Sequence, residues 1–189
     1  RAMRMDENES TLVISASDRV DGGGVFVYEK DSSGQNWNTA HTTELNSPLA
    51  VASSNFGCRV DISKNYIIVG ANWKNMAFIF EKDIATNTWK PDPIANLSNS
   101  GYVSGFGWPV RIEDNTAVVG VHSGSAVLIY ERNSTTGLWN TSPVAIFTGE
   151  YPFGRKFDFS GNILAILDKE NLYVYEKFLL NRTWNPIPI

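Results

Sequence analysis

The sequence predicts an all-β fold made of four copies of one unit, and two recurring features carry this prediction. The first is a strand of aromatic and aliphatic residues that ends in an acidic and a basic side chain, at 25–30, 77–82, 127–132 and 172–177. The second is a tryptophan seven or eight residues farther along, at Trp37, Trp89, Trp139 and Trp184. The tryptophans are separated by 52, 50 and 45 residues, and the four acidic residues have the same separations. Two markers with one set of spacings identify an internal repeat.

Each unit begins with a short segment in which apolar and polar residues alternate. These segments are 60–62, 110–112 and 157–159, with 3–5 at the matching place of the first copy. Strict alternation predicts a strand with one buried face. A Phe-Gly pair opens three of the copies, and we expect Phe56, Phe106 and Phe153 to be buried between units, each followed by a glycine that permits close backbone approach.

The second and third strands of each unit are continuous apolar runs, which is typical of strands buried on both faces. The second strands are 11–16, 66–71, 116–121 and 163–168, and the third strands are the marker strands. The fourth strand follows the tryptophan and is more polar. Its prolines predict an edge strand, because proline cannot donate to a strand ladder; they are Pro91, Pro93, Pro143, Pro186 and Pro188.

A four-stranded antiparallel unit with an alternating inner strand, a buried middle and a polar outer edge is a propeller blade. The predicted fold is therefore a β-propeller-type architecture of four four-stranded antiparallel blades. The blades either close on themselves or form part of a larger or assembled propeller. We expect one domain over 1–189, with repeats at approximately 1–50, 51–100, 101–148 and 149–189.

The second copy resembles the FG-GAP repeat family. Its residues carry Phe56-Gly57, an alternating strand, an Ile-Val-Gly-Ala run, a strand ending in Glu81 and finally Trp89. The fourth copy departs from the pattern, with Leu167-Asp168 in place of Gly-Ala. FG-GAP propellers occur in integrin α-subunits and in secreted surface proteins, so the resemblance implies a propeller and, by analogy, an extracellular interaction role.

Integrin-like members of that family carry a calcium loop between the first two strands of a blade. The corresponding turns here, 63–65, 113–115 and 160–162, are too short and too poor in carboxylates to supply six to eight oxygen ligands. We therefore expect no metal site and no other cofactor.

No constellation of residues predicts catalysis. The two histidines, His41 and His122, lie at different places of different copies, and the only cysteine, Cys58, leaves no Cys/His spacing for zinc. The recurring Glu-Lys pairs predict a structural role, and the recurring tryptophans predict packing of each blade against its neighbour. The expectation is that the protein is not an enzyme. Cys58 is expected to be a small buried residue, with an intermolecular disulfide as the alternative.

The net charge of −4 and the absence of any apolar run of about 20 residues argue against nucleic-acid binding and membrane insertion. Five Asn-x-Ser/Thr sequences favour a secreted, extracellular or cell-surface glycoprotein, with candidate sites at Asn8, Asn96, Asn133, Asn140 and Asn181. The chain begins Arg1-Ala2-Met3, so we expect a precursor to extend beyond it.

Two functional hypotheses remain. The first is a non-enzymatic extracellular structural or adhesion module that makes protein–protein contacts, including contacts with copies of itself in a larger ring or fibre. The second is a carbohydrate- or ligand-binding lectin-like propeller. Its candidate contact residues are the aromatic side chains outside the repeat markers, Trp73, Tyr102 and Trp108.

Overall fold

The structure, a computed structural model, describes residues 2–49, 53–98, 101, 104–178 and 180–189. Within them the strands form four antiparallel sheets, each from one consecutive stretch of chain. Blade 1 contains β1 (Met3–Met5), β2 (Thr11–Ala16), β3 (Gly24–Glu29) and β4 (Thr43–Asn46). Blade 2 contains β5 (Phe56–Ser63), β6 (Tyr66–Ala71), the 3₁₀ turn η1 (Asn72–Lys74), β7 (Met76–Asp83), the short β8 (Thr88–Trp89) and β9 (Ala95–Ser98).

Blade 3 contains β10 (Phe106–Glu113), β11 (Thr116–Val121), β12 (Ala126–Glu131) and β13 (Ala145–Thr148). Blade 4 contains β14 (Lys156–Ser160), β15 (Ile163–Leu167) and β16 (Leu172–Glu176). The predicted antiparallel blade architecture is confirmed. Within the described residues blade 4 has three strands, and the Ile189 amide donates to the Val174 carbonyl at 2.8 Å, as Ile94 does to Ile79 in blade 2.

The predicted position of the prolines was wrong. Pro91 and Pro93 precede β9 and Pro143 precedes β13, so these prolines lie in the turn before the outer strand and not within it. A proline has no amide hydrogen for the ladder. The first ladder donor is instead the residue after the proline: the Ile94 amide bonds to the Ile79 carbonyl, and the Val144 amide makes the equivalent bond in blade 3.

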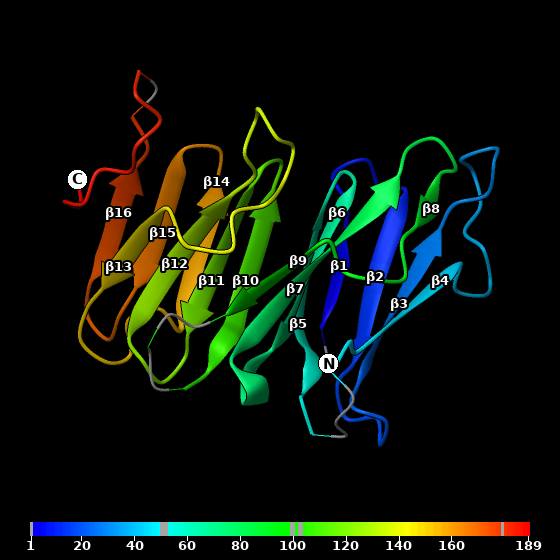
Figure 1. Cartoon of the computed structure of the whole chain (residues 1–189), viewed down its shortest axis with the longest axis horizontal. Helices are drawn as coiled ribbons and strands as arrows, with labels where there is room; N and C mark the ends of the chain where they lie inside the picture. Colours follow the sequence, from blue (N-terminus) through cyan, green and yellow to red (C-terminus); the bar gives the residue numbers. More distant parts are fainter. Residues whose placement is uncertain (1, 50–52, 99–100, 102–103, 179) are drawn as a thin grey trace.

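The four blades stand side by side in chain order, with blade 1 and blade 4 at opposite ends of the long axis (Figure 1). Neighbouring blades touch through their inner strands, as β5 and β10 do. Because blades 1 and 4 lie at opposite ends of the molecule, the blades form an open arc, and the closed four-bladed alternative is not the arrangement of this molecule (Figure 1).

The hydrophobic core lies between blades. One cluster joins Val13 of blade 1 to Phe56 of blade 2, and a second joins Ile68 of blade 2 to Phe106 of blade 3. A third joins blade 3 to Phe153 of blade 4. The three phenylalanines of the Phe-Gly pairs are at most 1% exposed, which confirms that they are buried between blades.

The glycines explain how closely the blades approach. Gly107 has a φ of 97°, and its carbonyl oxygen lies against Gly70 of the preceding blade. A Cβ added to Gly70 would come within 2.0 Å of that oxygen, and Gly120 meets the carbonyl of Gly154 in the same way at 2.5 Å. The Phe-Gly turn of the next blade therefore leaves no room for a side chain at Gly70 and Gly120, whereas blade 1 carries Ser15 at the equivalent position.

Candidate functional site

The acid-base pairs at the ends of the third strands connect neighbouring blades. Lys82 of blade 2 lies 2.6 Å from the carboxylate of Glu29 in blade 1. Lys177 of blade 4 lies 2.7 Å from the carboxylate of Glu131 in blade 3. In both cases the basic residue of one blade pairs with the acidic residue of the preceding blade, which confirms the structural role predicted for the repeat.

The junction between blades 2 and 3 uses an aromatic ring instead. The guanidinium of Arg132 lies 5.7 Å from the centre of the Tyr66 ring, and the Tyr66 hydroxyl donates to Glu81 at 3.3 Å. Glu81 is already paired with Lys90 of its own blade at 2.6 Å. The tyrosine therefore connects the acidic residue of blade 2 to the basic residue of blade 3.

The repeated tryptophans pack against the preceding blade, as predicted. Trp139 meets Tyr66 of blade 2 edge to face, with ring centres 5.5 Å apart. Trp184 meets Phe147 of blade 3 at 6.2 Å, and its Nε1 donates to Glu131 at 3.4 Å. Trp139 is 6% exposed and Trp184 is 8% exposed.

The two end faces carry the unmatched halves of this junction. Trp37 in blade 1 is not covered by any other described blade and is 37% exposed, with the Lys30 ammonium 5.7 Å from the centre of its ring. At the opposite end Glu176 is exposed. Within the part of the chain that the structure describes, neither Lys30 nor Glu176 has an oppositely charged partner.

The inner strands carry a second pattern that alternates in charge. Arg4, Asp61, Arg111 and Asp158 occupy the same register position in the four blades. Arg4 pairs with Asp61 at 3.5 Å, Asp61 accepts the Ile112 amide at 2.9 Å, and Arg111 pairs with Asp158 at 3.0 Å. Burial raises the pKa of Asp61, against the opposing effects of the amide bond and the two arginines. The arc thus begins with an arginine and ends with an aspartate whose side chain is 80% exposed.

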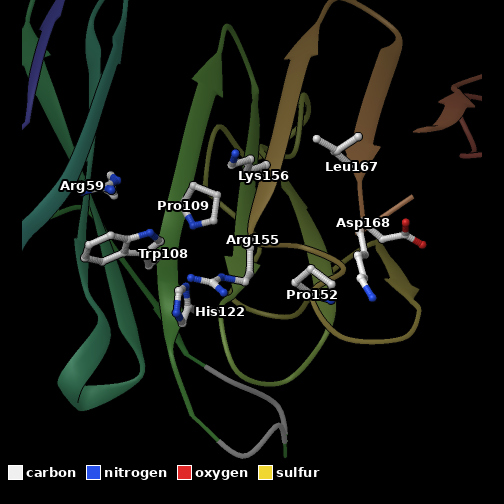
Figure 2. A pocket seen from close by; sticks show the side chains of 10 residues that line it. Arg59, Trp108, Pro109, His122, Pro152, Arg155, Lys156, Leu167 and Asp168 are labelled. Atoms are coloured by element: carbon white, nitrogen blue, oxygen red, sulfur yellow. The ribbon is translucent and has the colours of Figure 1, made fainter. Parts of the chain in front are cut away.

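A pocket of about 650 Å³ opens at the edge of the sheets where the inner strands of blades 3 and 4 begin (Figure 2). Four cationic side chains line it: Arg59 of blade 2, with Arg155, Lys156 and Lys169 of blade 4. The other lining residues are Trp108, Pro109, His122, Pro152, Leu167 and Asp168. The guanidinium of Arg59 stacks 3.6 Å from the centre of the Trp108 ring, which fixes its position.

The single carboxylate of the pocket is engaged in its own turn. Asp168 accepts the amides of Glu170 and Asn171 at 2.8 and 2.7 Å and the hydroxyl of Tyr173 at 2.9 Å. The two backbone bonds are the largest cause that lowers the pKa of Asp168 to about 2. Burial, followed by the charges of Arg155 and Arg59, lowers the pKa of His122. The electrostatic character of the pocket is therefore positive.

Of the three aromatic residues predicted as ligand contacts, one lies in this pocket. Trp108 lines it, and one face of its ring is covered by Arg59. Trp73 is 66% exposed on η1 and does not line the pocket, and Tyr102 lies outside the described residues. The cations were missed, although Arg59 and Lys156 stand at one position, directly before the alternating segment of two copies.

The predicted glycosylation sites are placed as follows. Asn133 and Asn181 are exposed in the segments after the third strands of blades 3 and 4, Asn96 is exposed on β9, and Asn8 is exposed between β1 and β2. Asn140 is half-buried. Glycosylation of these residues stays a prediction.

Cys58 is a free thiol that is 2% exposed, as expected for a small buried residue. Burial raises its pKa to about 11, so the reactive thiolate is disfavoured. Among the described residues, no three His, Cys, Asp or Glu side chains are grouped so that they could hold a metal ion. No helix in the described part of the chain is long and apolar enough to cross a membrane.

No family model matches the sequence, and no curated protein is similar to it. Solved structures match its fold. A protein from Lactobacillus plantarum aligns with a TM-score of 0.69 at 11% identity, over 100% of this chain and 55% of its own. The WD40 domain of Toxoplasma gondii coronin aligns at 0.65 and 11% identity, over 93% and 42% of the two chains.

The periplasmic gluconolactonase of Pseudomonas aeruginosa aligns at 0.64 and 11% identity, over 97% of this chain and 51% of its own. The WD40 domain and the gluconolactonase are β-propellers. This chain spans about half the length of each of these three structures. At such identities the comparison establishes the fold alone.

Proposed function

We propose that this protein is a non-enzymatic interaction module whose two open blade faces bind protein, and that copies of the chain join head to tail in a larger ring or fibre. The observation that carries the proposal is the pair of end faces. Blade 1 presents a lysine and a tryptophan that inner blades bury against a preceding blade, and blade 4 presents the glutamate that such a lysine would meet.

The inner strands support the same orientation. Placing Arg4 of one copy beside Asp158 of another would continue the alternation of arginine and aspartate without a break. The end faces also expose apolar side chains, among them Met3 on blade 1 with Ile163 and Leu172 on blade 4. Covering them stabilises the assembly by removing apolar area from water. A head-to-tail contact is heterologous, so it closes into a ring or propagates as a fibre according to its angle.

The extracellular location is part of this proposal. Its support is the FG-GAP-like pattern of the second copy and the exposed sequons at Asn8, Asn96, Asn133 and Asn181. The absence of a catalytic role is likewise proposed. It rests on the lack of a nucleophile–base pair in the sequence motifs, and on the structural use of the repeated Glu-Lys pairs.

Charge reversal with light scattering tests the assembly. The unmodified chain is expected to form species larger than its 21.0 kDa mass as concentration rises. Lys30→Glu and Glu176→Lys, each alone, should shift the protein towards monomer, because like charges then meet at the contact. An equimolar mixture of the two variants should assemble again, since each variant face now has an opposite partner.

Lys74→Glu is the matched control, because Lys74 is an exposed cation on η1 away from both end faces. It should leave the assembly unchanged. A chain that stays monomeric at high concentration would overturn the self-association, and so would a mixture that fails to recover what the single variants lost.

The second candidate function is ligand binding. The observation that favours it is the cationic pocket beside Trp108.

A further inference from the structure

We infer that the pocket between blades 2, 3 and 4 binds a small ligand that carries an oxyanion, a carboxylate, sulfate or phosphate, on a body the size of one or two sugar rings. This inference is separate from the proposed assembly and does not depend on it.

The pocket is locally positive although the chain is negative overall. The chain as a whole carries a net charge of −4, yet four cationic side chains gather around this pocket. Within the described residues, none of Arg59, Arg155, Lys156 and Lys169 has a carboxylate within ion-pairing distance. Several cations elsewhere in the fold are paired, as Lys82 is with Glu29. Unneutralised cations that converge on one concavity favour an anionic ligand.

The one carboxylate among the lining residues, Asp168, forms no ion pair with these four cations in the described part of the chain. Asp168 lines the pocket, but its two oxygens accept two backbone amides and the Tyr173 hydroxyl. Its charge is held by those donors in the turn between β15 and β16. The pocket therefore keeps its cations available for an incoming anion.

The Arg59 side chain is held in position by contacts within the protein. Arg59 is half-buried and held by its stack on Trp108, and its Nη1 donates to the carbonyl of Cys58 at 2.8 Å. Figure 2 shows the Arg155 side chain extending towards His122, and its Nη1 donates to the Tyr151 hydroxyl at 2.8 Å. Two guanidinium groups that line one pocket match the planar, two-pronged geometry of oxyanions better than ammonium groups would.

The volume and the apolar lining of the pocket indicate the size of the ligand. A volume of about 650 Å³ lies in the range of small-molecule sites. Pro109, Pro152 and Leu167 add apolar surface beside the cations. A bare inorganic ion would leave this surface uncovered, whereas a ring-sized organic body would cover it.

Titration calorimetry on the unmodified chain tests the inference. The probes are sodium sulfate, inorganic phosphate, glucose 6-phosphate, glucuronate and a sulfated disaccharide, with glucose as the neutral control. We expect each anionic sugar to bind more tightly than glucose and more tightly than the inorganic ions, with affinity that falls as salt is added. The ranking of phosphorylated, carboxylated and sulfated probes identifies the source of the oxyanion.

Variants locate the binding. Arg155→Gln and Lys156→Gln change exposed residues, so folding should be unaffected, and each should weaken binding about tenfold, as expected for the loss of one charge-assisted hydrogen bond. Arg155→Lys should recover part of the loss. Lys74→Gln, which removes an exposed cation outside the pocket, should bind like the unmodified chain.

Three results would overturn the inference: no binding of any anionic probe at millimolar concentration, equal binding of glucose, or an equal loss in Lys74→Gln. If sulfate and phosphate alone bind as tightly as the anionic sugars, the assignment of a ring-sized ligand is wrong. None of these outcomes depends on the mass of the assembled particle, so they are distinguishable from a failure of the proposed assembly.

Discussion

The inner blade junctions and the two end faces use the same repeated residues with different results. At an inner junction the tryptophan of one copy is buried by the preceding blade, as Trp139 is by Tyr66. At the first face the equivalent Trp37 is 37% exposed, and at the last face Glu176 forms no ion pair within the described residues. The comparison teaches that the repeat unit is not a self-contained fold, because its large apolar side chains form clusters that each span two blades.

The fourth blade differs from blades 2 and 3 at the position that glycine occupies in their second strands. Gly70 and Gly120 lie under the Phe-Gly turn of the next blade, and Leu167 stands at the equivalent position of β15. No described residue of this chain presses on Leu167 in that way, and it is 42% exposed. At Gly70 and Gly120 it is therefore the backbone of the neighbouring blade that excludes a side chain.

The largest expected difference in stability is between substitutions of two repeated tryptophans, Trp139 at an inner junction and Trp37 at an end face. Trp139→Ala should lower the free energy of unfolding by about 3–5 kcal/mol, because it opens a cavity at a junction. Trp37→Ala should cost less than about 1 kcal/mol, since no blade covers that ring. Urea unfolding measures both losses. It is carried out at a protein concentration at which light scattering shows that the chain is monomeric. Equal losses would contradict the distinction between junction and end face.

The glycine positions give the next effect. Gly120→Ala places a Cβ within 2.5 Å of the Gly154 carbonyl oxygen, so we expect a loss of about 1–3 kcal/mol from forced separation of the blades. Leu167→Ala, at the equivalent position of the last blade, should cost less because the side chain is partly exposed. The same unfolding measurements apply, and a neutral Gly120→Ala would show that the blades adjust freely.

The ion pairs give a smaller difference. Lys82→Gln should destabilise the protein by about 1–2 kcal/mol, because it leaves the largely buried Glu29 carboxylate without its partner. Lys30→Gln at the first face should change the stability of the monomer by less than about 0.5 kcal/mol. A double-mutant cycle with Glu29→Gln checks that the larger loss comes from this pair, and a coupling of zero would exclude it.

The smallest effect is a pH dependence at the cationic pocket. The pKa of His122 lies below its ordinary value of 6.5, so the folded state favours the neutral imidazole. Its contribution to stability is present above pH 6.5 and is lost as the pH falls through the folded pKa. Unfolding free energies of the unmodified chain and of His122→Asn should therefore converge between pH 7 and pH 5. A difference that is constant with pH would contradict this assignment.

The repeat, the strand order and the buried phenylalanines followed from the sequence alone. The period of about 50 residues and the alternation of apolar and polar side chains can be read from the sequence, and they do not depend on how the blades pack against one another. The structural role of the Glu-Lys pairs could also be predicted. An acidic and a basic residue that recur at the same place in every copy are more easily explained by blade packing, which all copies share, than by a catalytic site. Features that are contained within a single blade can therefore be predicted from the sequence.

Only the tertiary structure decided whether the arc closes and where the cations meet. Closure depends on the angle between blades, which is set by packing at the junctions rather than by any single residue type. Arg59 and Arg155 are far apart in sequence, and they face one pocket because blades 2 and 4 flank blade 3. The unmatched charges at the two ends likewise exist only because blade 1 and blade 4 do not meet.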